Sequence, residues 1–184
     1  MRGAAHKART RSEAWLVLRA QNDDRQALDS LLRAVQKPLF RHLRGVTRNN
    51  ADAAELLQET LMQIYRKLRT LREPTLFRPW CYRIATRSAY KLFQQQEKLR
   101  ISPIPDALAE VAAPPPRRTL VHELGRDLHE LVAEVSVASR SVLLLHYEEE
   151  LTLREIAETL GISIGTVKSR LAYGIAALRT RWAD

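Results

Sequence analysis

The residues best suited to a chemical task in this chain are cationic side chains on a helix expected near the C-terminus. Residues 159–183 contain no Asp or Glu. The basic side chains in this stretch are Lys168, Arg170, Arg179 and Arg181. Cations gathered along a helix suit the phosphates and base edges of nucleic acid. We therefore predict that this helix binds DNA; the alternative, an ordinary helical hairpin, does not account for the missing acidic residues.

The preceding residues have the pattern of a helix-turn-helix that would position these cations. Thr152 and Glu155 form the S/T-x-x-E pattern of a capping box, in which each side chain accepts a hydrogen bond from the other residue's backbone N–H. Gly161 is expected to end this helix in a left-handed conformation, and Ser163 to cap the next one. A helix-turn-helix requires a small residue, a tight turn and an apolar anchor, which here are Ala157, Gly161 and Val167.

The composition favours a helical protein with a polyanionic partner. Among 184 residues only 6 are Gly and 8 are Pro, and the formal net charge is +9. The single cysteine, Cys81, excludes an internal disulfide and a multi-cysteine zinc site, and its apolar neighbours place it in the core. No apolar run approaches the ~20 residues of a membrane span, so we expect a cytoplasmic protein without membrane insertion.

The N-terminal half has the apolar spacing of three helices. The apolar positions of the first helix are Leu28, Leu31, Leu32, Val35 and Leu39. We expect Pro38 to bend or end that helix. The second helix is expected over 53–71, with Asp52 as its N-cap. Two prolines within 72–79 predict a loop, and the third helix should begin near Trp80.

Charge and proline content divide the chain into four parts. Residues 1–14 are basic, lack an apolar period and are expected to be disordered. Residues 15–98 form the first predicted bundle and hold 16 Lys/Arg against 8 Asp/Glu. Residues 99–121 contain five prolines and should be an extended linker to the second bundle, 122–184, which holds 7 Lys/Arg against 10 Asp/Glu. The predicted fold is all-α: two small helical bundles joined by a Pro-rich linker.

Three segments in order resemble a known family. They read DAAELLQETLMQIYRKL over 52–68, WCYRIATRSAY over 80–90 and LTLREIAETLGISIGTVKSRL over 151–171. From about residue 20 to residue 182, the chain resembles the extracytoplasmic-function RNA polymerase sigma factors of the sigma-70 family. These small bacterial factors keep only the second and fourth domains of the larger ones. The resemblance implies a sigma region 2-like bundle followed by a sigma region 4-like helix-turn-helix bundle.

The second predicted helix carries an acidic face. Glu55, Gln58 and Glu59 are three and four residues apart, so they share one side of the helix. In the family this side docks on a coiled coil of the polymerase's largest catalytic subunit, and its acids pair with basic side chains. Without the resemblance, a solvated acidic face would be the simpler interpretation.

The resemblance also implies contacts with two promoter elements. The loop before the third helix and that helix's exposed side would open and read the −10 element, which requires aromatic and cationic side chains that hold unstacked bases. The matching residues are Phe77, Arg78, Arg83, Arg87 and Tyr90. The three arginines are the stronger candidates, because the aromatic residues of this segment, Trp80 included, also suit the core. The recognition helix would lie over the −35 element through Thr166, Lys168, Ser169, Arg170, Ala172 and Tyr173. Thr166 and Arg170 suit phosphates, whereas Lys168 and Ser169 have donors for base edges.

Two segments depart from the family pattern. Members usually carry Asn and Asp on the third helix where this chain has Arg87 and Lys91, and they are richer in arginine where it has glutamines over 94–96. Gly174 inside the recognition helix should weaken that helix by ~1 kcal/mol relative to alanine. We therefore expect an unusual promoter sequence or help from another factor.

The resemblance implies a transcription initiation factor whose partners are bacterial core RNA polymerase, promoter DNA and, as a further candidate, an anti-sigma factor. It implies no catalytic residue, no cofactor and no metal ligand. Two alternatives stay open. A polymerase-independent helix-turn-helix regulator would bind DNA alone and leave the 55–59 face idle. A sigma mimic would act only through protein–protein interaction, supported by the weakened basic positions at 91–96 and 172–176.

Overall fold

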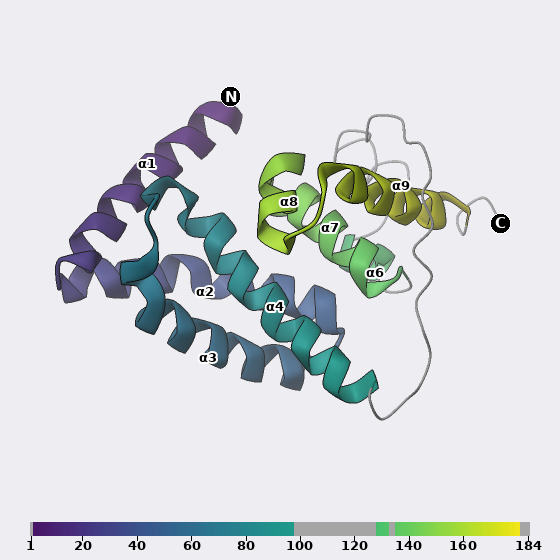
Figure 1. Ribbon diagram of the computed structural model, residues 1–184, viewed down its shortest axis with the longest axis horizontal. Coiled ribbons are helices and arrows are strands. Elements are labelled where there is room, and N and C mark those ends of the chain that lie inside the picture. The colour runs from purple at the N-terminus through teal and green to yellow at the C-terminus, as the bar shows by residue number, and fades with distance from the viewer. Residues whose placement is uncertain (1, 98–127, 133–134, 181–184) are drawn as a thin grey trace.

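The computed structural model describes residues 2–97, 128–132 and 135–180. The N-terminal helices are α1 (Arg2–Gln21), α2 (Arg25–Thr47), α3 (Asn50–Lys67) and α4 (Phe77–Glu97), with the short 3-10 helices η1 (Leu68–Thr70) and η2 (Pro74–Leu76) between α3 and α4 (Figure 1). The C-terminal helices are α6 (Leu128–Leu131), α7 (Val137–Tyr147), α8 (Leu153–Leu160) and α9 (Ile164–Thr180). The described residues contain no β-strand, which confirms the all-α prediction. None of their helices is long and apolar enough to cross a membrane.

Helix α2 continues through Pro38, where the sequence predicts a bend or an end. It continues to Thr47 and is capped by Arg48, whose φ of 60° is left-handed. The apolar residues that follow the proline, Leu39, Leu43 and Val46, are each 0% exposed. Burying a large apolar side chain stabilises a fold by about 1.5–3 kcal/mol, so these three together offset the ~3 kcal/mol cost of an internal proline.

Helices α3 and α4 both begin earlier than their sequence patterns predict. The Asn49 side chain caps α3 by accepting a hydrogen bond from the Ala51 N–H at 2.8 Å. Asp52 is therefore not the N-cap; it lies in the first turn, where its charge suits the helix dipole. Helix α4 already begins at Phe77, because Pro79 falls in a first turn that needs no N–H from it.

The N-terminal residues also differ from expectation, because 2–14 form the first part of α1 rather than a disordered tail. The Glu13 carboxylate on α1 accepts hydrogen bonds from Arg78 Nε at 2.9 Å and from Arg78 Nη2 at 2.6 Å, and both side chains are mostly buried. Val17 on the same helix is 0% exposed. The ion pair joins residues 65 positions apart, so no local sequence pattern could indicate it.

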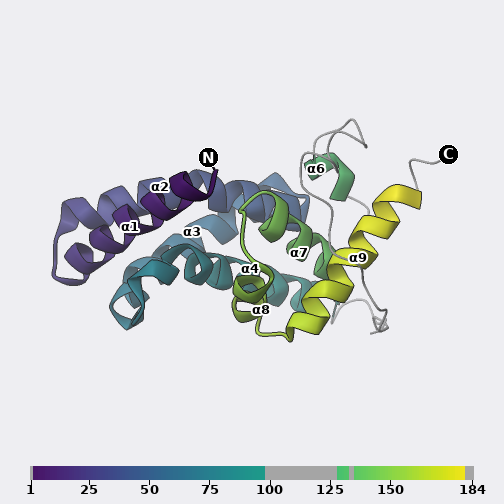
Figure 2. The same ribbon diagram turned by 90° about the horizontal axis from the view of Figure 1, so that it is seen from above.

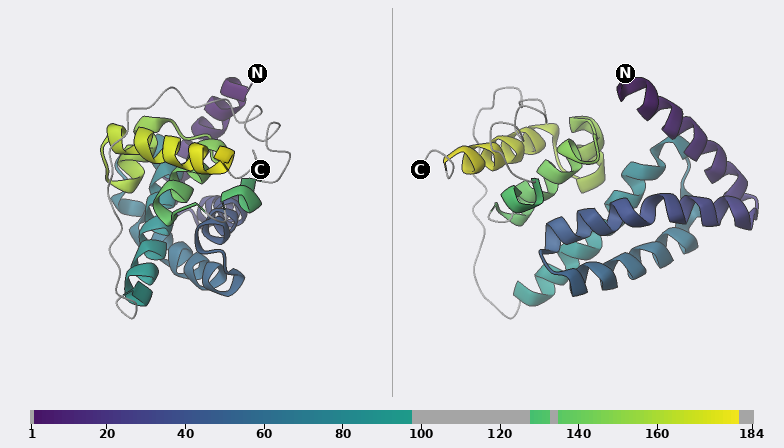
Figure 3. Two further views of the ribbon diagram at one scale, coloured as in Figure 1. Left: turned by 90° about the vertical axis from the view of Figure 1, so that its right-hand side faces the viewer. Right: turned by 180° about the vertical axis from the view of Figure 1, so that it is seen from behind.

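The two bundles lie in direct contact. Helix α7 packs against α2, and α8 packs against α4 (Figure 2). The C-terminal helices gather on one side of the α1–α4 bundle (Figure 3). Buried apolar residues from both bundles form one continuous core, which includes Cys81. The linker predicted over 99–121 lies outside the described residues.

Candidate nucleic-acid interface

Helices α8 and α9 form the predicted helix-turn-helix, and its local chemistry is confirmed. In the capping box, the Glu155 N–H donates to Thr152 Oγ1 at 3.2 Å, and the Thr152 N–H donates to Glu155 Oε2 at 2.8 Å. Gly161 ends α8 with a left-handed φ of 69°. The Ser163 hydroxyl accepts a hydrogen bond from the Thr166 N–H at 3.0 Å, which starts α9. The turn is therefore set by residues within fifteen positions of one another.

The expected −35 residues on α9 differ in exposure. Lys168 and Tyr173 are exposed, and Thr166, Arg170 and Ala172 are half-buried. Ser169 is 9% exposed, and its hydroxyl donates to the Thr166 carbonyl at 3.0 Å. In this structure Ser169 therefore bonds its own helix rather than offering a free donor.

Ile164 is a surface residue that the sequence reasoning missed. It is 45% exposed at the start of α9 and lies four residues before Lys168, so both side chains occupy one side of the helix. An exposed apolar side chain beside a cation suits a thymine methyl group in the major groove. An isolated large apolar residue next to a helix cap was the signal in the sequence.

Some of the expected −10 residues are exposed cations, whereas others are buried and pack within the protein. Arg83 and Arg87 are exposed one turn apart on α4. Phe77 is 1% exposed, with its ring centre 6.5 Å from that of Trp80. Arg78 is held by the Glu13 carboxylate described above. Phe77 and Arg78 therefore fix the start of α4 in this conformation and do not face solvent.

Tyr90, the fifth expected −10 residue, is half-buried between the two bundles. Burial raises the pKa of its hydroxyl, while the neighbouring Ser141 hydroxyl of α7 and the charge of Arg170 on α9 oppose this effect. The charge of Arg170, an expected −35 residue, thus influences an expected −10 residue.

The predicted acidic face on α3 is on the surface. Glu55, Gln58 and Glu59 are all exposed. The same side continues along the helix with Met62, 47% exposed, and Tyr65, 64% exposed. Exposed apolar surface beside these acids is a feature that protein-docking sites share. The sequence reasoning missed these two, although their helical spacing from Glu59 is regular.

No group of three or more His, Cys, Asp or Glu side chains suited to a metal ion occurs in the described parts of the chain.

Comparisons with known proteins show which family the chain belongs to. The Sigma-70 region 2 family matches residues 31–99, and the Sigma-70, region 4 family matches residues 125–178. The chain is 30% identical over 169 residues to the ECF RNA polymerase sigma-E factor of Haemophilus influenzae, covering 85% of this chain and 87% of the relative. It is 28% identical over 144 residues to the RNA polymerase sigma factor SigV of Bacillus subtilis, covering 78% and 84%.

The fold is also similar to a solved structure, that of the sigma factor RpoE in complex with the anti-sigma factor NepR from Bartonella quintana. The TM-score is 0.64 at 18% identity, over 83% of this chain and 94% of that one. Since both sigma regions are matched in order, and a relative at 30% identity aligns along most of both chains, this protein belongs to the extracytoplasmic-function RNA polymerase sigma factors of the sigma-70 family.

Proposed function

We propose that the protein binds bacterial core RNA polymerase in the cytoplasm and directs it to promoters through −10 and −35 recognition, performing no covalent chemistry itself. The observation that carries this proposal is family membership together with an unobstructed α3 face. We assign core binding to Glu55, Gln58 and Glu59, extended by Met62 and Tyr65. This combination suits a polymerase surface that offers basic side chains next to apolar ones.

We assign contact with the −10 element first to Arg83 and Arg87, the exposed cations of α4. They suit the phosphates and bases of a single strand. Phe77 and Arg78 fix the start of α4 and thereby hold the exposed arginines of this helix in position. Because Arg87 stands where the family usually has Asn, we expect promoter opening to be slower here than in typical members.

We assign contact with the −35 element to the start and outer side of α9. The contributing residues are Ile164, Thr166, Lys168, Arg170, Ala172 and Tyr173. Lys168 supplies a donor for base edges and Ile164 an apolar contact, whereas Thr166 and Arg170 hold phosphates. An anti-sigma factor is a further proposed partner, supported by the RpoE–NepR likeness in fold.

The test is transcription from a promoter library by purified protein and bacterial core polymerase. We expect specific transcripts with core polymerase, and weak binding of promoter duplex by the chain alone. A tight promoter complex without polymerase would favour the independent regulator. Core binding that yields no transcript from any library member would favour the sigma mimic.

A further inference from the structure

Helix α1 presents an indole to solvent on the side that faces away from the bundle. Trp15 is 62% exposed, and Leu18 is 44% exposed. The residues that attach α1 to the bundle lie on the opposite side of the helix: Val17 is 0% exposed, and Glu13 forms the ion pair with Arg78. Tryptophan is highly buried on average, because burial of its large apolar surface is favourable. An indole this exposed indicates a surface that contacts a partner.

Positive charge accompanies this indole. Arg11, Trp15 and Leu18 are separated by four and three residues, so their exposed side chains form one strip along α1, the α1 outer face. Residues 2–21 contain five Lys/Arg and a single acid, Glu13, whose side chain is buried against the bundle. The α1 outer face therefore combines apolar surface with positive charge, and a polyanion is its complementary partner.

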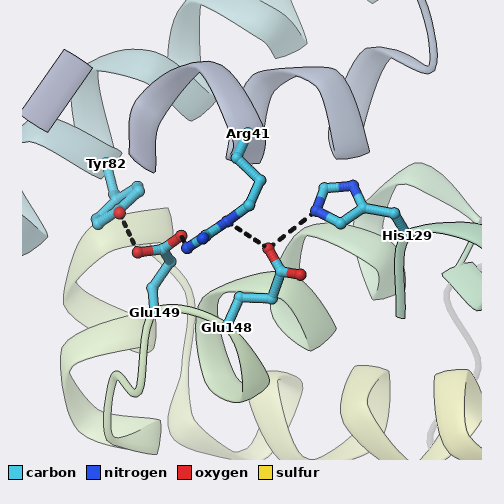
Figure 4. Close-up of polar contacts among 5 residues, drawn as sticks. All are labelled: Arg41, Tyr82, His129, Glu148 and Glu149. Atoms are coloured by element: carbon cyan, nitrogen blue, oxygen red, sulfur yellow. Dashed lines mark hydrogen bonds and ion pairs between the residues drawn. The ribbon is translucent and has the colours of Figure 1, made fainter. Parts of the chain in front are cut away.

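Arg11 is available for such a partner, unlike arginines that the fold already uses. Arg41 of α2 lies between two carboxylates, with Nε 3.1 Å from Glu148 Oε2 and Nη2 2.9 Å from Glu149 Oε1 (Figure 4). Arg11 is exposed, and no ion pair joins it to a carboxylate in the part of the chain that the structure describes. A phosphate can therefore bind Arg11 without displacing an internal partner.

The α1 outer face adjoins the expected −10 surface. Helix α1 packs against η2, which lies in the loop before α4, and the Glu13–Arg78 ion pair holds α1 to the first turn of α4. The ribbon views show the start of α4 beside the middle of α1 (Figures 1 and 3). A helix with its side chains is about 10–12 Å in diameter, so a few nucleotides of single strand extend from the start of α4 across α1.

Other occupants fit the α1 outer face less well. A DNA duplex keeps its bases stacked inside and would offer the Trp15 indole only its backbone. A membrane surface would attract Arg11, but Trp15 and Leu18 alone give little apolar surface for stable anchoring. In a two-fold dimer the same face meets itself, so the cations of two copies would repel each other. Unpaired bases offer both a surface for stacking and a phosphate for the cation.

We propose that the α1 outer face binds the unpaired promoter strand where it extends beyond the −10 element, with the Trp15 indole stacked on a base and Arg11 bound to a phosphate. This inference rests on the proposed function and adds a DNA contact outside α4 and α9. Because the stacked base must be unpaired, this contact forms only after the strands separate. It therefore stabilises the open promoter without selecting the duplex.

The test measures binding of the full chain to a fluorescein-labelled single strand of about 16 nucleotides by anisotropy, over a series of salt concentrations. We expect Trp15→Ala to weaken binding about tenfold at every salt concentration, because one stacking contact is lost and no counterion is involved. Arg11→Ala should instead reduce the slope of log affinity against log salt by about 0.7, the value for one phosphate contact on a single strand.

Two variants serve as controls. Trp15→Phe keeps an aromatic ring and should lose no more than about threefold in affinity. Arg33→Ala removes one cation from α2, where the side chain is 77% exposed and pairs with Asp29, and it should leave the salt slope unchanged. Circular dichroism should show the same helix content for all variants, because the replaced side chains are exposed.

Three results would overturn the proposal. The first is equal single-strand affinity for wild type and Trp15→Ala. The second is an equal loss with the matching duplex, which would place base pairs rather than an unpaired strand on α1. The third is a dependence on Trp15 of binding to phosphatidylserine vesicles but not to the single strand, which would favour a membrane surface.

Open promoter complexes separate this inference from the proposed function. On a promoter recovered from the library, holoenzyme with Trp15→Ala should form open complexes that live about tenfold shorter, at unchanged affinity for core polymerase. Equal lifetimes would overturn the inference and leave the proposed function intact. If the single-strand affinities change as expected but the wild type gives no transcript with core polymerase, the proposed function fails while the single-strand site on α1 stands.

Discussion

The imidazole of His42 on α2 is completely buried. Its Nε2 lies 2.9 Å from Thr86 Oγ1, and its ring packs edge-on to Tyr82 at 5.3 Å. Burial lowers the pKa of His42 to about 4, so the ring is neutral in the folded protein. The charged and titratable groups around it are Arg41, Tyr82, His129 and Glu148.

This burial predicts a loss of stability in mild acid. The unfolded chain takes up a proton on His42 as the pH falls below about 6.5, whereas the folded chain does so only near pH 4. The free energy of unfolding should therefore fall by about 2 kcal/mol between pH 7.5 and pH 5. Urea denaturation of wild type and His42→Gln measures the effect. Equal pH slopes for the two proteins would contradict the assignment.

At the same scale, Glu59 should be decisive for polymerase binding. Glu59→Arg places a cation against basic side chains of the proposed docking partner, and we expect a loss of about 2 kcal/mol or more, roughly thirtyfold in affinity. The matched control is Glu158→Arg, the same charge change at an exposed position of α8. Anisotropy titration with labelled core polymerase measures the affinity of both variants. Equal affinities would contradict the role assigned to the acidic face of α3.

Alanine substitution of Lys168 and of Ser169 should affect the −35 base preference differently, although the two residues are adjacent. Lys168→Ala removes an exposed donor and should relax the −35 base preference, at about 1–3 kcal/mol of discrimination. Ser169→Ala removes a hydroxyl bonded within α9 and should leave the preference unchanged. Sequencing of transcribed promoters from each holoenzyme measures the preference. A larger change for Ser169→Ala than for Lys168→Ala would mean that α9 lies on DNA by another side.

Two glycines at the turn between α8 and α9 allow a matched comparison of how alanine substitution affects stability. Gly161 has a φ of 69°, and Gly161→Ala should destabilise the domain by about 1–2 kcal/mol because a side chain is strained in this conformation. Gly165 is helical and its added Cβ would meet only Ser163 Oγ at 3.5 Å, so Gly165→Ala should be neutral or stabilising. Thermal unfolding of both variants checks the difference, and equal midpoints would contradict it.

Elements defined by local chemistry could be predicted from the sequence. The capping box at Thr152 and Glu155, the left-handed Gly161 and the cap at Ser163 each involve residues a few positions apart, so their side-chain types suffice. The cap of α3 was assigned to the wrong residue because Asn49 and Asp52 both suit that role. The first part of α1 could not be predicted, because the ion pair that attaches it to the bundle involves Arg78, which is distant in the sequence.

At the scale of the whole molecule, the packing of the two bundles against each other could not be predicted. Arg41 and Glu149 are 108 positions apart, and separately each looks like an ordinary surface charge. Only folding brings their helices together and removes water from the carboxylates. The same reason explains why Tyr90 was expected on the DNA surface but lies between domains.

The ion pair between Glu13 and Arg78 limits where the chain can be shortened. A recombinant fragment that starts at Trp15 deletes the carboxylate and leaves a guanidinium that is 15% exposed with its main acceptor gone. That loss falls in the first turn of α4, the same helix that carries Arg83 and Arg87. Fragments intended for crystallisation or labelling should therefore retain Glu13 and the part of α1 that carries it.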